Sequence, residues 1–169
     1  MVLSNMTGSD RPEAPPAAVT LELARADIGF SAAHFSVVGG VSERLHGHNY
    51  RVGLRAHGTP ADDGAVLDFR TLKAALRSAC AALDERMLVP TASGSVGVQE
   101  DGETVIITEA QRRFVMPRSD VCLLPVSNTT CECLAQHLLH VVREQLGPLP
   151  LRLELRVEEL PGQGAVARE

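Results

Sequence analysis

The hydrophobic and polar positions of this chain first alternate with the two-residue period of β-strands. Residues 19–23 alternate in this way, and the chain is expected to run on extended as far as His34. A second strand is expected over roughly residues 46–57, and Gly58-Thr59-Pro60 ends it. The Gly39-Gly40 pair predicts the turn that lets these two strands pair as antiparallel neighbours.

Two later segments place their apolar side chains at helical spacing. The first predicted helix begins at an Asp68 cap and ends near residues 84–86. The second begins at Thr129-Thr130-Cys131-Glu132, which has the Thr-x-x-Glu form of a capping box, and it ends at Gly147-Pro148. The chain is therefore expected to contain one helix near its middle and one nearer its end.

Strand signals lie on both sides of the second helix. A β-hairpin is predicted for residues 96–100 and 104–108, joined by Asp101-Gly102, and residues 113–116 suggest a further short strand. The last strand, which begins near Leu151, alternates most regularly of all. The order of two strands, helix, hairpin, helix and strand predicts an α+β fold with the helices on one face of an antiparallel sheet.

Length and composition limit the classes of protein that this chain can be. The 169 residues suit one domain over residues 18–169, after a Pro- and Ala-rich tail at residues 1–17 that is expected to be disordered. A net charge of −5 without a basic stripe argues against nucleic acid as a partner. The chain shows no membrane-length apolar run and no secretory leader, so a cytoplasmic protein is expected. The cysteines lack a paired spacing and predict free thiols: Cys80, Cys122, Cys131 and Cys133.

Three histidines form the strongest candidate site. His46 and His48 fall on one face of their predicted strand, because side chains two residues apart point the same way. His34 ends the preceding strand and would stand beside them if the two strands pair. Three imidazoles with an open fourth position are typical of catalytic zinc. The alternative is that His46 and His48 are solvated histidines on an exposed strand.

A carboxylate near the end of the last strand also suggests binding. Glu159 shares the parity of Leu155 and Val157, so its side chain is expected on the apolar side of the sheet. A lone charge there is costly unless it is paired, and a ligand with an amidine- or guanidine-like edge would pair with both of its oxygens. The alternative is a strand end that frays into solvent.

Several short motifs together resemble one family of enzymes. These motifs are Phe30-Ser31-Ala32-Ala33-His34, Leu45-His46-Gly47-His48-Asn49-Tyr50, Leu67-Asp68-Phe69, Leu83-Asp84, Asn128-Thr129-Thr130-Cys131-Glu132 and Val157-Glu158-Glu159. In this order the chain resembles the 6-pyruvoyl-tetrahydropterin synthase and 6-carboxy-tetrahydropterin synthase family from about residue 19 to residue 165. The resemblance implies the tunnelling fold, an antiparallel four-stranded sheet with two helices on one face, and a homo-oligomer that is a trimer or a hexamer.

The resemblance also implies roles for particular residues. Zinc would be held by His34, His46 and His48, and a pterin substrate would be anchored by Glu159. Thr130 and Glu132 would help to hold the pterin from a neighbouring subunit. A plain capping box explains the same two residues equally well.

The chain departs from the family pattern in three ways. A catalytic cysteine precedes the His-Gly-His motif in many members, whereas this chain has Glu43 in that region and no cysteine before Cys80. The Glu-x-x-His-Gly-His form is similar to a branch that converts dihydroneopterin triphosphate to 6-hydroxymethyl-dihydropterin. The family's Asp-His proton relay reads Asp84-Glu85 here, which could also be two solvated acids at a helix end. Residues 90–125 form an insertion relative to compact members.

These features favour a zinc-dependent pterin lyase that works by retro-aldol cleavage. Glu43 would act as the base and Asp84 with Glu85 would relay the second proton. One alternative is 6-carboxy- or 6-pyruvoyl-tetrahydropterin synthesis, against which the missing cysteine argues. Another is a pterin- or metal-binding protein that has lost catalysis, since fold and binding residues can outlast chemistry.

Overall fold

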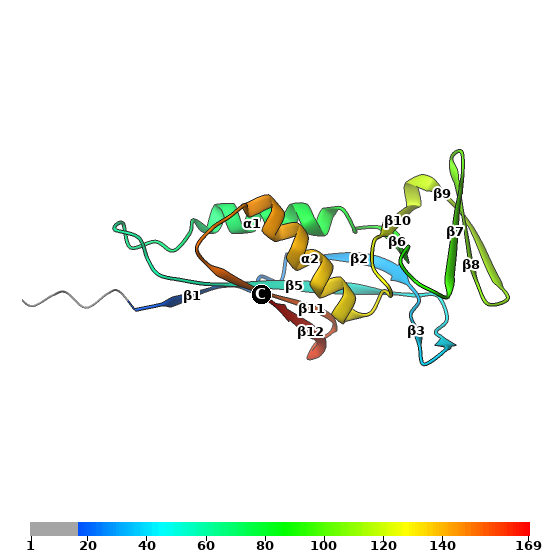
Figure 1. The fold of residues 1–169 in the computed structure, drawn as a ribbon, viewed down its shortest axis with the longest axis horizontal. Coiled ribbons are helices and arrows are strands. Elements are labelled where there is room, and N and C mark those ends of the chain that lie inside the picture. Colours follow the sequence, from blue (N-terminus) through cyan, green and yellow to red (C-terminus); the bar gives the residue numbers. More distant parts are fainter. Residues whose placement is uncertain (1–16) are drawn as a thin grey trace, which may run out of the picture.

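The computed structural model describes residues 17–169, and its main feature is a curled mixed sheet with two helices packed on one face (Figure 1). The tail predicted for residues 1–17 lies, except for Ala17, outside the described residues. Within the described part, no helix is long and apolar enough to cross a membrane. The predicted α+β class, with both helices on one side of the sheet, is confirmed.

The main sheet contains seven strands, three more than the four expected. Its order is β10-β6-β2-β5-β11-β12, and β1 pairs with β5 as well. The β10–β6 and β6–β2 pairs are parallel and the other pairs are antiparallel. The strands are β1 (Val19–Leu23), β2 (Gly29–His34), β5 (His46–Gly58), β6 (Arg86–Pro90), β10 (Val121–Leu124), β11 (Arg152–Leu160) and β12 (Gln163–Arg168).

The strand β5 is long enough to pair with two successive strands along one edge. Its first half pairs with β2 and its second half with β1, while β11 pairs along the other edge. The single extended run predicted for residues 19–34 is therefore two strands, with a turn that Ile28 N closes by donating to Arg25 O at 3.2 Å. The predicted antiparallel pairing of β2 with β5 is confirmed, and Gly39-Gly40 turns the small β3 (Val37–Val38) and β4 (Val41–Ser42) hairpin between them.

The helices α1 (Phe69–Ala81) and α2 (Cys131–Leu146) cover the apolar face of the sheet. Asp68 caps α1 as predicted, because its carboxylate accepts from Arg70 N at 2.7 Å. The core lies between the helices and the even-numbered side chains of β5, and its fully buried members include Leu72, Leu76, Leu134, Leu138, Leu153 and Leu155.

The capping box predicted at Thr129 is wrong. The residue at the helix cap is Thr130, and its side chain makes no capping hydrogen bond. The hydroxyl of Thr129 instead donates to Phe35 O at 2.8 Å, and Thr129 is fully buried. The Thr129 hydroxyl therefore makes a tertiary hydrogen bond to the segment after β2 and does not cap the helix.

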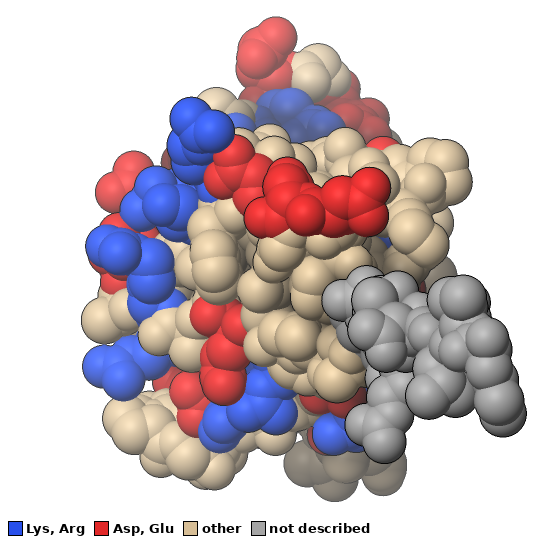
Figure 2. Space-filling model, turned by 90° about the vertical axis from the view of Figure 1, so that its left-hand side faces the viewer, with Lys and Arg blue, Asp and Glu red and all other residues tan. Residues whose placement is uncertain are grey.

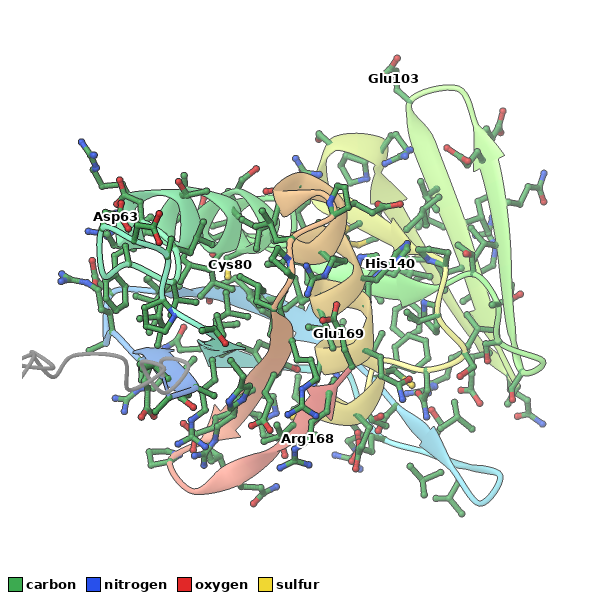
Figure 3. The ribbon with its side chains drawn as sticks, turned by 60° about the vertical axis from the view of Figure 1, so that its left-hand side comes forward. Asp63, Cys80, Glu103, His140, Arg168 and Glu169 are labelled. Carbon is green, nitrogen blue, oxygen red and sulfur yellow. The ribbon has the colours of Figure 1, made fainter. Side chains whose placement is uncertain are left out.

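Residues 96–117 form a separate three-stranded sheet that extends from one end of the molecule (Figure 1). The predicted hairpin and third strand are confirmed as β7 (Val96–Asp101), β8 (Thr104–Glu109) and β9 (Arg112–Pro117). Figure 3 places Glu103 at the outer tip of this extension. A second hydrophobic core, with Phe35, Val89, Val105, Ile107 and Val121 among its buried members, joins the extension to the main sheet. The short helix η1 (Arg118–Asp120) follows.

Candidate active site

Three histidines meet on the helix-covered face of the sheet. The β2–β5 register places His34 opposite His46, and His48 lies two residues further along β5. The ring centroids are 4.6 Å apart for His34 and His46, 5.3 Å for His34 and His48, and 4.8 Å for His46 and His48. One ring nitrogen from each residue can be chosen so that all three lie within 4.8 Å of one another. The structure thus brings together the three residues that the sequence suggested as ligands.

Backbone carbonyls fix which ring nitrogen carries the proton in two of these histidines. His34 Nδ1 lies 3.0 Å from Thr129 O, and His46 Nδ1 lies 2.7 Å from Arg44 O. A carbonyl oxygen only accepts hydrogen bonds, so each Nδ1 must donate its proton. The lone pair of each neutral ring is then on Nε2, the atom left free to bind a metal.

The surroundings of His34 favour the neutral form that a metal requires. Its side chain is buried, and burial lowers its pKa, with a further decrease from the nearby His46 and His48. Among the described residues, His34 Nε2 has no hydrogen-bond partner. A buried and unpaired acceptor beside two more imidazoles suits a metal such as zinc, which binds neutral imidazole nitrogens.

The carboxylate of Glu43 is held just ahead of β5. Its Oε2 accepts from the Ser36 hydroxyl and from the Ser36 backbone N–H at 3.3 Å, and Glu43 N donates to Ser36 O at 2.9 Å. The two hydrogen bonds to the carboxylate lower the pKa of Glu43, first through the Ser36 side chain, with smaller contributions from His46 and His34. Glu43 is therefore an ionised acceptor in the electrostatic field of the histidines.

Glu159 lies at the end of β11, on the face that strand alternation predicted. Its Oε2 is 3.9 Å from His48 Nε2 and 3.7 Å from the sulfur of Cys131, and Gln163 donates to its other oxygen. The Glu159 side chain is 19% exposed, so a ligand that reached it would displace little water. This position suits a carboxylate that pairs with a planar donor edge.

Two further residues near this cluster were not predicted as site residues from the sequence. Tyr50 shares the parity of His48 on β5, and its buried hydroxyl has no hydrogen-bond partner among the described residues. Cys131 opens α2 and donates to Glu159, and burial raises the pKa of its thiol to about 12. Tyr50 could have been predicted, because it lies on the same face of β5 as His48. Cys131 could not, because only the packing of α2 on the sheet places it beside Glu159.

Thr130 and Glu132 occupy the cap and first turn of α2. The pKa of Glu132 is lowered by its own backbone N–H and then by the Thr130 side chain. Within the described chain, neither residue forms a hydrogen bond or ion pair with the histidines or with Glu159. Their assignment to substrate binding stays a prediction.

Asp84 and Glu85 lie between α1 and β6, and Glu85 lines the same surface hollow as His48. Asp84 accepts from Ser31 N at 2.7 Å, and Glu85 N donates to Ser31 O at 2.7 Å. Glu85 has a left-handed backbone, with φ of 55°, which lets the chain turn into β6 after α1 ends at Ala81. Across residues 17–169, no hydrogen bond or ion pair links these two acids to the three histidines, and their relay role stays a prediction.

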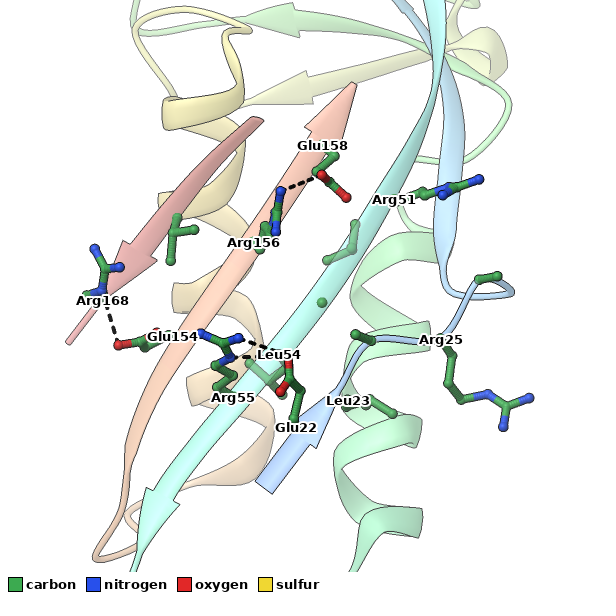
Figure 4. Close-up of a pocket in the computed structure, with 15 residues that line it drawn as sticks. Glu22, Leu23, Arg25, Arg51, Leu54, Arg55, Glu154, Arg156, Glu158 and Arg168 are labelled. Carbon is green, nitrogen blue, oxygen red and sulfur yellow. Dashed lines mark hydrogen bonds and ion pairs between the residues drawn. The ribbon is translucent and has the colours of Figure 1, made fainter. Parts of the chain in front are cut away.

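A hollow of about 260 Å³ lies on the opposite face of the sheet, away from the helices (Figure 4). Its charged side chains are largely neutralised by ion pairs of Arg55 with Glu22, Arg168 with Glu154, and Arg156 with Glu158. Figure 2 shows acidic and basic side chains side by side on the part of the surface that it presents. The hollow is lined by no histidine or cysteine, so the histidine cluster is the stronger candidate for an active site.

The sequence matches known proteins over most of its length. A family profile described as 6-pyruvoyl tetrahydropterin synthase matches residues 24–169. A relative from Methanocaldococcus jannaschii, provisionally named 6-carboxy-5,6,7,8-tetrahydropterin synthase, is 29% identical over 149 residues, which are 85% of this chain and 91% of the relative. A relative from Pyrococcus horikoshii with the same provisional name is 28% identical over 78% of this chain and 80% of its own length.

The fold matches solved structures as well. The 6-pyruvoyl tetrahydropterin synthase of Plasmodium vivax superposes with a TM-score of 0.87 at 29% identity, over 90% of this chain and 98% of that protein. The Plasmodium falciparum enzyme gives a TM-score of 0.85 at 27% identity, with the same coverage. Two further structures of the Plasmodium vivax enzyme carry alanine or cysteine in place of a glutamate described as a catalytic residue.

Proposed function

Because this chain belongs to the 6-pyruvoyl tetrahydropterin synthase family, we propose that it is a zinc-dependent lyase that shortens the side chain of a dihydroneopterin substrate. The lyase class follows from the family; the metal, the substrate and the product, 6-hydroxymethyl-dihydropterin, are the proposal. The observation that carries it is an ionised Glu43, stabilised by Ser36, beside three histidines that share one face.

His34, His46 and His48 are the residues that would hold zinc. The neutral and buried Nε2 of His34 supports this assignment, as do the Nδ1 hydrogen bonds that orient two of the rings. Bound zinc would supply Lewis acidity, which lowers the pKa of hydroxyl groups that it contacts.

Glu159 is the proposed anchor for the pterin ring. The 2-amino-pyrimidine edge of a pterin offers two parallel N–H donors, and the two carboxylate oxygens of Glu159 can accept both. The present partners of these oxygens, Gln163 and Cys131, are neutral donors that such an edge can replace. This contact would point the substrate side chain from Glu159 past His48 toward the other histidines.

Glu43 is the proposed base for bond cleavage. It would take the proton of the side-chain hydroxyl farther from the ring, while the bond between the two hydroxyl-bearing carbons breaks and its electron pair enters the dihydropterin ring. The distal fragment leaves as an aldehyde, and protonation of the remaining carbon gives the hydroxymethyl product. Delivery of that second proton by Asp84 and Glu85 is part of the proposal.

We also propose that the working protein is a homo-oligomer, a trimer or a hexamer. Support comes from the resemblance, in which the residues matching Thr130 and Glu132 reach the pterin from a neighbouring subunit. In a single chain these two residues lie at the start of α2 and have no direct contact with Glu159 by hydrogen bond or ion pair.

The second candidate is 6-carboxy- or 6-pyruvoyl-tetrahydropterin synthesis, favoured by the names of the relatives. Against it stands the absence of any cysteine before Cys80 in the sequence. Cys131 is close to Glu159, but a thiol whose pKa is raised to about 12 stays protonated at neutral pH and makes a poor base. The glutamate described as catalytic in the Plasmodium vivax enzyme supports a carboxylate in this role.

The deciding experiment is to incubate the zinc-loaded protein with dihydroneopterin triphosphate and to identify the products by mass. We expect 6-hydroxymethyl-dihydropterin from the wild type and at least a 100-fold loss in Glu43→Gln, the order of magnitude for removing a general base. Glu103→Gln, at the outer tip of the extension, is the matched control and should behave as the wild type.

Each other result has a definite meaning. Unchanged turnover in Glu43→Gln excludes Glu43 as the base. A pyruvoyl or carboxy product establishes the second candidate instead. Tight pterin binding without turnover of any neopterin-type substrate identifies a binding protein that has lost catalysis.

A further inference from the structure

The extension reaches back to the candidate site through the turn between β8 and β9. This turn consists of Ala110 and Gln111, and it places Glu109 opposite Arg112 as the closing pair of the hairpin. Ala110 has a left-handed backbone with φ of 50°, which is uncommon for a residue with a side chain. Two-residue hairpin turns favour this conformation because it follows the natural twist of the strands. The turn therefore presents Arg112 in a defined direction.

The guanidinium of Arg112 is fixed on several sides at once. Its Nε donates to Glu109 at 2.9 Å, and Glu109 is buried, with only 6% of the residue exposed. Its plane also lies over two aromatic rings, 4.9 Å from the centroid of Phe35 and 5.7 Å from that of Phe114. An arginine held by a buried carboxylate and by ring stacking has few other orientations open to it.

The remaining donors of Arg112 bind the segment that carries Glu43. One terminal nitrogen donates to the backbone oxygen of Glu43 at 2.6 Å, and the other donates to the hydroxyl of Ser42. Ser36 holds the same segment from the other side, through the Glu43 carboxylate and backbone N–H. Arg112 thus holds the main chain of Glu43, whereas Ser36 also holds its side chain.

We propose that Arg112 is a positioning residue, through which the extension of residues 96–117 holds Glu43 in the place where it faces the three histidines. The inference rests on the proposed function, in which the Glu43 carboxylate takes a proton from the substrate. It assigns the extension a task at the active site, although no residue of the extension belongs to the histidine cluster.

The test compares Arg112→Gln with Arg113→Gln. Arg113 is the exposed neighbour on β9, and its side chain makes no hydrogen bond or ion pair in the described part of the chain, which makes it a matched control. In Arg112→Gln we expect kcat to fall by about 10- to 100-fold, as for a small misplacement of a catalytic group, with KM and zinc content close to those of the wild type. Arg112→Lys should restore only part of kcat, since an ammonium lacks the planar fork.

Hydrogen exchange gives a readout that does not need turnover. The peptide that spans Ser36 to Leu45 should exchange faster in Arg112→Gln than in Arg113→Gln, while peptides from α2 exchange as in the wild type. If Arg112→Gln does not fold, Ser42→Ala removes a single partner of Arg112 and should show the same pattern at smaller amplitude.

The two proposals fail in different ways. If the wild type turns over no pterin but Arg112→Gln still shows faster hydrogen exchange, the proposed function is overturned. The contact between the extension and Glu43 then still stands. Active wild type, with equal kcat and equal exchange in the Arg112 and Arg113 variants, overturns the positioning role and leaves the proposed function standing. A rise in KM alone in Arg112→Gln also overturns the positioning role.

Discussion

The hydroxyl of Ser36 donates a hydrogen bond to the carboxylate of Glu43, and the backbone N–H of Ser36 lies 3.3 Å from the same oxygen. Both bonds favour the ionised carboxylate, so Glu43 is ready to accept a proton over a wider pH range than a free glutamate. The same bonds make it a weaker base. Ser36 therefore keeps the Glu43 carboxylate ionised at lower pH but reduces the driving force for proton transfer to it.

Replacement of Ser36 by alanine should move the acid limb of the pH–rate profile. Loss of the hydroxyl removes the largest cause of the lowered pKa, so the pKa of Glu43 rises and the carboxylate becomes protonated at higher pH. We expect the acid limb of kcat/KM to shift to higher pH in Ser36→Ala, measured with dihydroneopterin triphosphate. Ser119→Ala, on the helix η1, is the control, and an acid limb at the same pH in both variants would contradict the role of Ser36.

Zinc should stabilise the folded protein through His34. A ligand that binds only the folded state at 100 times its Kd adds about 2.7 kcal/mol of stability. We expect a rise of this order in the free energy of unfolding of the wild type, reversed by a chelator, and almost none in His34→Gln. His140→Gln is the matched control, because His140 is an exposed residue of α2 (Figure 3). Equal stabilisation of the His34 and His140 variants would place the metal elsewhere.

Two glycines of the main sheet should respond very differently to an added methyl group. A Cβ at Gly29 would lie 2.0 Å from the backbone oxygen of Tyr50, whereas a Cβ at Gly53 meets nothing closer than 3.5 Å. Gly29→Ala must push β2 away from β5, and with it His34. We expect a loss of about 3 kcal/mol or more in unfolding free energy, at the high end for single substitutions, together with weaker zinc binding.

The matched variant for this comparison is Gly53→Ala, whose effect should stay within about 1 kcal/mol. Urea unfolding and zinc titration of both proteins measure the difference. Similar stability of the two variants would mean that β2 and β5 do not approach as closely as described.

Asp27 should make stability depend on pH in the acid range. Its carboxylate accepts from Arg25 and from Arg77 of α1, each at 2.7 Å, and the Arg25 hydrogen bond is the main cause that lowers its pKa to about 2. Because the folded pKa lies below the ordinary value of 3.8, the stabilisation is present above that value and is lost as pH falls toward 2.

Asp27→Asn should accordingly lower the urea midpoint at about pH 6 and have less effect near about pH 2. High salt should reduce the difference, since this ion pair is half exposed. The control is Asp63→Asn, in the loop before α1, whose carboxylate accepts, from residues 17–169, only a local backbone hydrogen bond from Ala65. An effect of Asp27→Asn that is equal at both pH values would contradict the assignment.

Strand alternation was enough to place the principal residues of the site on one face. His34, His46, His48 and Glu159 follow from a period that backbone geometry fixes, and the pairing of β2 with β5 needed only a glycine turn between two apolar runs. The confirmed Asp68 cap is equally local, because the carboxylate bonds to a backbone N–H two residues along the chain. These confirmed features depend on strand period or on contacts between residues close in the sequence.

Features that depend on distant parts of the chain could not be predicted. The sequence suggested that Thr129 caps α2. Its hydroxyl instead donates to Phe35 O, which belongs to a segment far away in the sequence. The strands β6 and β10 are short and largely buried, without the alternation that marks half-exposed strands. Arg112 is one arginine among many in the sequence, and only the folded extension brings it to Glu43.

The hydrogen bond from His34 to Thr129 O has a consequence for the order of folding. The three histidines lie on β2 and β5, which are paired strands close together in the sequence. Thr129, in contrast, is 95 residues from His34. Closing a short loop costs less entropy than closing a long one, so we expect the three imidazoles to come together before α2 docks. Until then nothing from Thr129 fixes the tautomer of His34, and its ring is free to bind through either nitrogen. If the three histidines hold zinc as proposed, docking of α2 would fix which nitrogen of His34 binds it. Zinc added early in refolding should then be released more easily than zinc added at the end.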